Sequence, residues 1–148
     1  MTILSPRQMH AGPPATTEAR LDNPTFQAFW LLRIGLTLAP ILFGLDKFAH
    51  VLVDWDIYLA PEFTDLFNAE AHTLMYFVGV IEVVAGLAVL LRPRVGGYLV
   101  AAWLTGIIIN LLIMADFYDI ALRDFGLVLA ALTLTRLATA FPNTGLRR

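Results

Sequence analysis

The sequence contains no cysteine and few charged residues, and both shortages limit what the protein can be. Of its 148 residues, 15% are charged and 58% are hydrophobic, whereas soluble domains have about 25% charged and about 45–50% apolar residues. The lack of cysteine excludes disulfides, thiol redox chemistry and cysteine-ligated iron–sulfur or zinc sites. A formal net charge of −2 offers no basic surface to nucleic acid, so we expect no nucleic-acid partner.

Long apolar runs fill most of the chain between residues 24 and 142. A run of about 20 apolar residues is long enough to cross a bilayer as a helix. We therefore predict an all-α fold, a bundle of four transmembrane helices with the bilayer as its partner. The predicted helices cover about 24–50, 72–91, 95–115 and 120–141, between a disordered tail (1–23) and a basic C-terminal tail (143–148).

Caps and prolines indicate where these helices begin and end. Asn23 precedes Pro24, and this pair is typical of a helix start, because the side chain caps the first turn and proline at the first position loses no hydrogen bond. The connection 51–71 has five acidic residues, no basic residue and apolar side chains at helical spacing. This pattern predicts a short amphipathic helix beginning at Pro61 at the membrane interface, with Trp55 as a headgroup-level anchor.

Lysine and arginine outside the predicted spans indicate the orientation in the membrane. Connection 51–71 has none, and the turn after the third span offers only Arg123 among acidic residues. The other basic residues outside the spans fall on the opposite side: Arg7, Arg20, Arg92, Arg94, Arg147 and Arg148. The positive-inside rule therefore predicts a multi-pass protein with both termini in the cytoplasm.

Four ionisable residues lie within or at the ends of the predicted spans: Arg33, Lys47, Glu82 and Arg123. Such residues are costly in hydrocarbon and usually face protein or water, so each is a candidate functional residue. Arg33 and Lys47 share one stripe of the first helix with Thr37, Pro40 and Gly44, and we expect this stripe to face the bundle.

Glu82 lies near mid-depth, with Gly79 and Gly86 on nearly the same face to allow close helix packing. Two interpretations of this carboxylate remain open at the sequence level. A fixed pair of Glu82 with Arg33, or with Lys47 reaching from the other direction, would hold helices together. A Glu82 without a partner would be neutral and would suit a proton relay.

Further polar candidates gather at the predicted outer end. We expect Asp119 to pair with Arg123 four residues later and to cap the fourth helix, and Arg123, Gly126, Ala130 and Thr133 to face a neighbouring helix. Asn110 predicts a hydrogen bond between helices. The secondary candidates at similar depth are Asp46, His50, Asp116 and Asp124.

The histidines and tryptophans are assigned no cofactor. His50 and His72 both fall near the outer surface, where a solvated histidine is commoner than a ligand, so we predict no metal site and rank a bis-histidine haem low. Trp30 and Trp103 are expected in the interfacial belt or against lipid. No cofactor is expected within the chain, and a quinone is the one ligand that we consider.

Four segments resemble the DoxX family of small four-helix bacterial membrane proteins: LLRIG (31–35), FGLDKF (43–48), GVIEVVAGLAVLL (79–91) and ALRDFG (121–126). The resemblance covers about residues 30–140 and implies a bundle in the bacterial cytoplasmic (inner) membrane. It also implies that Arg33, Lys47, Glu82 and Arg123 occupy the family's polar positions. Members of that family are linked to quinol oxidase, to thiosulfate:quinone oxidoreductase and to complexes that handle oxidative stress.

Three functional hypotheses follow. The first is a non-catalytic accessory or anchoring subunit of a redox or respiratory membrane complex, because no nucleophile lies beside a base and no complete catalytic set is visible. The second is a quinone-reactive subunit in which Glu82, with Lys47 or Arg123, binds the headgroup. The third is a small proton-linked carrier built as a homo-oligomer, with Glu82 as the proton site.

Overall fold

The computed structural model describes residues 21–141 of the chain. Its elements are α2 (Pro24–Ala49), the 3-10 helix η2 (Trp55–Tyr58), α3 (Pro61–Phe67), α4 (Ala71–Leu91), α5 (Pro93–Ile113) and α6 (Tyr118–Ala140). No strand occurs in this part of the chain, so the predicted all-α class is confirmed. The predicted tails lie largely outside the described residues.

 The arginines on which the predicted orientation depends at the two ends of the chain, Arg7, Arg20, Arg147 and Arg148, thus lie outside the described residues.

The helix starts follow the predicted signals. The Asn23 side chain accepts hydrogen bonds from the backbone N–H of Thr25 at 2.9 Å and of Phe26 at 3.4 Å, and Pro24 occupies the first turn of α2. Proline also stands in the first turn of α3 and of α5, where its missing N–H removes no helical hydrogen bond. For this reason α5 begins at Pro93, two residues before the predicted start.

Three of the long helices, α2, α4 and α5, are long and apolar enough to cross a membrane. Helix α6 has a comparable length of 23 residues, but it contains four charged residues: Asp119, Arg123, Asp124 and Arg136. The structure therefore supports three candidate membrane spans rather than clearly the predicted four, and the protein has the helix composition of a membrane protein.

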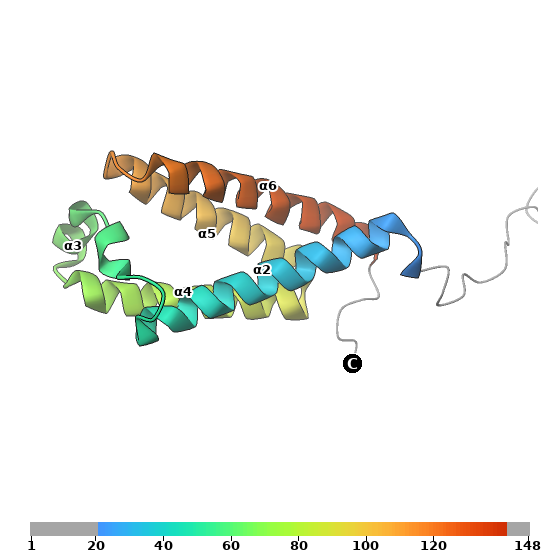
Figure 1. Ribbon diagram of the computed structural model, residues 1–148, viewed down its shortest axis with the longest axis horizontal. Helices are drawn as coiled ribbons and strands as arrows, with labels where there is room; N and C mark the ends of the chain where they lie inside the picture. The colour runs from blue at the N-terminus through green and yellow to red at the C-terminus, as the bar shows by residue number, and fades with distance from the viewer. Residues whose placement is uncertain (1–20, 142–148) are drawn as a thin grey trace, which may run out of the picture.

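The long helices form two antiparallel hairpins (Figure 1). One hairpin consists of α2 and α4, joined by η2 and α3, and the other consists of α5 and α6; the two are connected through the packing of α4 on α5. The helices α2 and α6 approach each other at the end where α2 begins and diverge toward the end that carries α3. Aromatic contacts of Phe141 with Phe26 and Phe29, each at 5.4 Å between ring centroids, close the narrow end.

Close backbone approaches fix the register within each hairpin. A Cβ atom on Gly44 would lie 2.6 Å from the carbonyl oxygen of Gly79, and a Cβ on Gly79 would lie 2.7 Å from that of Gly44. In the second hairpin, a Cβ on Gly97 would lie 2.9 Å from the carbonyl oxygen of Ala131. No side chain other than hydrogen fits at these points, so each hairpin has one register, as expected for small residues between membrane helices.

Candidate functional site

A buried ion pair joins the two helices of the first hairpin. Lys47 Nζ lies 2.7 Å from Glu82 Oε2, and the two residues are 3% and 7% exposed. The contact follows from the register, because Glu82 packs beside Gly44 and Lys47 packs beside Gly79. The two charged residues therefore flank the close contact of these glycines, and the long lysine side chain reaches across it to the carboxylate. Of the two interpretations of Glu82, the structure contains the paired one.

Arg33 is not the partner of Glu82. Its Nη2 donates a hydrogen bond of 2.5 Å to the carbonyl oxygen of Leu90, and its guanidinium lies 4.8 Å from the ring centroid of Trp30. Leu90 is eight residues from Glu82, or about 12 Å along the helix, which is beyond the reach of an arginine held at the level of Leu90. Of the two partners considered for Glu82, the structure therefore has Lys47 and not Arg33. Trp30, expected in the interfacial belt or against lipid, packs on the guanidinium of Arg33.

The connection after α2 covers the ion pair. Lys47 Nζ lies 3.8 Å from the ring centroid of Trp55, a cation–π contact that favours a charged ammonium. The indole Nε1 of Trp55 donates to Asp46 Oδ2 at 2.7 Å. Trp55 is therefore part of the site's cover, a role different from the headgroup anchor predicted from its position.

Asp46 holds this cover in place. Beyond the bond from Trp55, its carboxylate accepts hydrogen bonds from the backbone N–H of Val51 and of Leu52, both at 3.1 Å. The turn is possible because His50 adopts a left-handed conformation with φ of 52°, which ends α2. Asp46 is 7% exposed, so it acts here as a buried acceptor that shapes the connection.

An apolar pocket lies between the two hairpins next to the ion pair. It has a volume of about 330 Å³, at the lower end of the range for ligand sites. We call it the inter-hairpin pocket. All four long helices contribute lining residues: α2 (Leu31, Leu32, Gly35, Leu36, Ala39, Pro40, Phe43), α4 (Glu82, Ala85), α5 (Val100, Trp103, Leu104) and α6 (Leu127, Ala130). Glu82 is the one ionisable residue among them.

Trp103 of α5 lines the pocket. Its indole Nε1 is buried and lies beside the Glu82 carboxylate without the geometry of a full hydrogen bond. The sequence predicted Trp103 in the interfacial belt or against lipid and did not identify it as a pocket residue. An indole N–H and a carboxylate at the wall of an apolar pocket provide one donor and one acceptor to a ligand that carries polar groups on a flat apolar body.

Helix α6 presents a different face from the predicted one. Its buried residues are Ala121, Asp124, Ala131, Leu134, Thr135 and Ala138, whereas Arg123, Gly126 and Thr133 are exposed. The packing of Ala131 and Thr135 on Gly97 sets this rotation. The buried ionisable residue is therefore Asp124, which is 6% exposed, rather than Arg123.

The predicted pair of Asp119 with Arg123 is also replaced. Arg123 Nε lies 3.5 Å from Asp124 Oδ1. Asp119 does not cap α6, because Phe117 occupies the cap position and Asp119 is already in the first turn. Asp116 accepts a hydrogen bond from the backbone N–H of Phe117 at 2.8 Å, which shapes the α5–α6 turn.

Asn110 ties α5 to the connection of the first hairpin rather than to another helix. Its Oδ1 accepts from the backbone N–H of Ala60 at 2.9 Å, and its Nδ2 donates to the carbonyl oxygen of Tyr58 at 2.6 Å. Both bonds go to the chain between η2 and α3. The predicted bond between helices is thus replaced by a bond to a loop, and it joins the two hairpins at their wide end.

Comparison of the chain with protein-family models, with curated proteins and with solved structures gives no match.

Proposed function

We propose that the chain crosses the bacterial inner membrane four times, with α6 as the fourth span and both termini in the cytoplasm. Two features support this topology. Helix α6 packs along α5 as the second arm of a hairpin, and its charged residue Asp124 is turned inward. In addition, Arg92 and Arg94 flank the α4–α5 turn, whereas residues 51–71 contain no lysine or arginine.

Cysteine labelling tests the topology against a clean background, because the sequence has no cysteine of its own. Glu62→Cys, at an exposed position of α3, is expected to react with a membrane-impermeant maleimide in intact cells. Thr144→Cys is expected to react only after the membrane is opened. Labelling of both positions in intact cells would contradict an even number of spans.

The function that we propose is that of an accessory subunit of a redox membrane complex, which holds the headgroup of a membrane quinone in its inter-hairpin pocket. The inter-hairpin pocket itself carries this proposal, because it is apolar, lies between lipid-facing helices and has one carboxylate in its wall. A quinol hydroxyl would donate to Glu82, with the indole N–H of Trp103 beside the same group. The resemblance to the DoxX family supports the redox setting.

The ion pair gives this site a fixed acceptor. Lys47 Nζ occupies Glu82 Oε2 at 2.7 Å, so a ligand would approach the other carboxylate oxygen from the pocket. A buried carboxylate with a lysine partner stays in place without rearranging when the ligand binds, and such preorganisation lowers the cost of binding. The chain itself binds and orients the headgroup; electron transfer belongs to the partner subunits.

Substitutions at two glycines separate pocket binding from general stability. Gly35 lines the pocket, and a Cβ at Gly35 or at Gly106 would meet no atom within 4 Å. Because its Cβ meets no neighbour, Gly35→Leu is expected to place its side chain in the pocket and to weaken binding of decylubiquinol, measured by titration calorimetry in nanodiscs, by at least about tenfold. Gly106→Leu is the matched control. Equal affinity of both variants and the unchanged protein would refute the pocket as the quinone site.

The accessory role has its own test. Purification in mild detergent from cells at native expression level is expected to recover the chain together with a redox-active membrane or membrane-associated protein. Recovery of the chain alone would count against the role as a subunit while leaving quinone binding to be judged by the calorimetry.

A proton-linked carrier is the second candidate, and one observation favours it. Asp124, which is paired with Arg123, also lies close enough to act electrostatically on both Lys47 and Glu82. The two buried carboxylates therefore interact, and one proton could be shared between them. Glu82→Gln would then abolish pH-dependent flux in proteoliposomes while the protein still folds. A quinone subunit predicts no such flux in the unchanged protein.

A further inference from the structure

Two histidines and one aspartate come together at the wide end of the first hairpin. His50 ends α2, Asp56 lies in η2 and His72 is the second residue of α4. One ring nitrogen of each histidine and one carboxylate oxygen of Asp56 all lie within 4.8 Å of one another. None of the three residues lines the inter-hairpin pocket, so this cluster is separate from the proposed quinone site.

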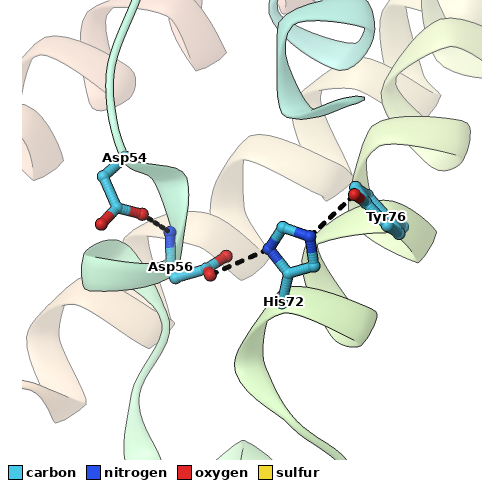
Figure 2. A network of polar contacts seen from close by, with 4 residues as sticks. All are labelled: Asp54, Asp56, His72 and Tyr76. Atoms are coloured by element: carbon cyan, nitrogen blue, oxygen red, sulfur yellow. Dashed lines mark hydrogen bonds and ion pairs between the residues drawn. The ribbon is translucent and has the colours of Figure 1, made fainter. Parts of the chain in front are cut away.

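One pair of atoms in this cluster already lies at the separation of two metal ligands. His72 Nδ1 lies 3.1 Å from Asp56 Oδ2 (Figure 2). In a tetrahedral zinc site with bonds of about 2.0–2.1 Å, two ligand atoms are about 3.3 Å apart. The imidazole rings of His50 and His72 are stacked with centroids 4.9 Å apart and planes 19° from parallel. The ligand atoms lie at most 4.8 Å apart, so a turn of the rings and an approach of up to about 1.5 Å would bring all three to one ion.

Two atoms of the cluster are buried and have no hydrogen-bond partner: His50 Nε2 and Asp56 Oδ1. Buried polar atoms are nearly always paired, and each exception calls for an explanation such as an ion. A cation bound by this cluster would supply the missing partner to both groups. Solvated histidines at a surface, as expected from the sequence, would leave no such buried atoms.

The surroundings of His72 resemble the second layer of a metal site. His72 Nε2 lies 2.7 Å from the hydroxyl of Tyr76, and a histidine that binds a metal through one nitrogen almost always hydrogen-bonds through the other. On the opposite side, the Asp54 carboxylate accepts a hydrogen bond of 3.2 Å from the backbone N–H of Asp56. Figure 2 shows both contacts, which orient the two ligands toward each other.

We propose that His50, Asp56 and His72 form a binding site for a divalent first-row transition-metal ion, with Zn²⁺ as the best-fitting ion. Two imidazoles and one carboxylate are a ligand set of zinc sites that keep a fourth position for water or another ligand. Mg²⁺ and Ca²⁺ prefer oxygen ligands throughout, so they fit poorly. A bound ion would connect the end of α2, η2 and the start of α4.

Metal titration of the full chain in detergent tests the site directly. After treatment with a chelator, the protein is expected to bind one Zn²⁺ per chain in competition with a chromophoric indicator, to bind Co²⁺ with the absorption of a four-coordinate ion, and to ignore Mg²⁺. Absence of both the Zn²⁺ binding and the Co²⁺ spectrum, or equal binding of Mg²⁺, would overturn the proposal.

Variants then locate the bound ion. His50→Ala, His72→Ala and Asp56→Asn are each expected to weaken Zn²⁺ binding by at least about 100-fold, and Tyr76→Phe, which keeps the ring, by about tenfold. His10→Ala removes the third histidine of the sequence, and Asp65→Asn removes an exposed carboxylate of α3; neither is expected to change the affinity. Binding that persists in His72→Ala, or that is lost in His10→Ala, would place the ion elsewhere and overturn the proposal.

Discussion

Breaking the pair between Lys47 and Glu82 is the sharpest test of how the first hairpin is held together. The two charges are 2.7 Å apart, which corresponds to a Coulomb energy of about 6 kcal/mol at an effective dielectric constant of about 20. Much of this energy offsets the cost of removing both charges from water. Removing one partner leaves the other buried and unpaired, and we expect a loss of about 3–5 kcal/mol in the free energy of unfolding.

The double variant separates the pair from its surroundings. Glu82→Gln and Lys47→Met are expected to show the full loss singly, whereas Lys47→Met with Glu82→Met removes both charges and is expected to lose much less than the sum of the single losses. Unfolding is measured by titrating mixed micelles with a denaturing detergent and following tryptophan fluorescence. Asp65→Asn, at an exposed carboxylate, is the control and is expected to change stability by less than about 0.5 kcal/mol.

Additive single losses in that cycle would refute the reasoning, because they would mean that the two groups do not interact in the folded protein. Single losses below about 1 kcal/mol would do the same, since they are typical of ion pairs exposed to water.

Three further predictions concern packing and the connection. Gly97→Ala is expected to destabilise the protein by about 1–3 kcal/mol, because its Cβ would lie 2.5 Å from Thr135 Cγ2. The control is Gly126→Ala, whose Cβ would meet no atom within 4 Å. In the same unfolding assay, its free energy of unfolding is expected to rise by up to about 1 kcal/mol. Asn110→Ala leaves the N–H of the fully buried Ala60 without its acceptor. Hydrogen exchange at that amide is therefore expected to accelerate by about tenfold or more. Unchanged exchange would refute the role of Asn110 in holding the connection to α5. Trp55→Leu removes the cover of Lys47 and is expected to make the connection more sensitive to proteolysis without changing the helical content measured by circular dichroism.

The helices were predictable from the sequence because their signals are local. The cap at Asn23 and the prolines at positions 24 and 61 act within one or two turns, and they mark the starts of observed helices. Pro93 also begins a helix, α5, two residues before the predicted start. The pairing of Glu82 was open at that level, because either Arg33 or Lys47 could face it. The contact of Gly44 with Gly79 decides the pairing, and the sequence shows that glycines permit close approach without showing which two will meet.

The roles of Trp55, Trp103 and the two outer histidines were not predictable for a related reason. Each role depends on where a connection folds or how a hairpin packs, over separations such as the 16 residues between Asp56 and His72. Helix α6 was predicted with the wrong face because small, apolar and polar residues lie all around it, so its sequence pattern alone does not indicate which side packs on α5. The sequence shows which polar and aromatic residues each helix carries, whereas tertiary packing determines what those residues contact.

The bond between Asn110 and the connection has a mechanical consequence. The hairpins meet at the narrow end, where Phe141 packs on Phe26 and Phe29. At the wide end, the two hydrogen bonds of Asn110 and the ring contact of Tyr58 with Phe117 fasten the connection of the first hairpin to the second hairpin. If the inter-hairpin pocket takes up a membrane quinone as proposed, access to it between the hairpins would depend on segment 55–67, which makes these contacts. A neighbouring protein that grips this segment would control access from outside the bilayer without touching the helices.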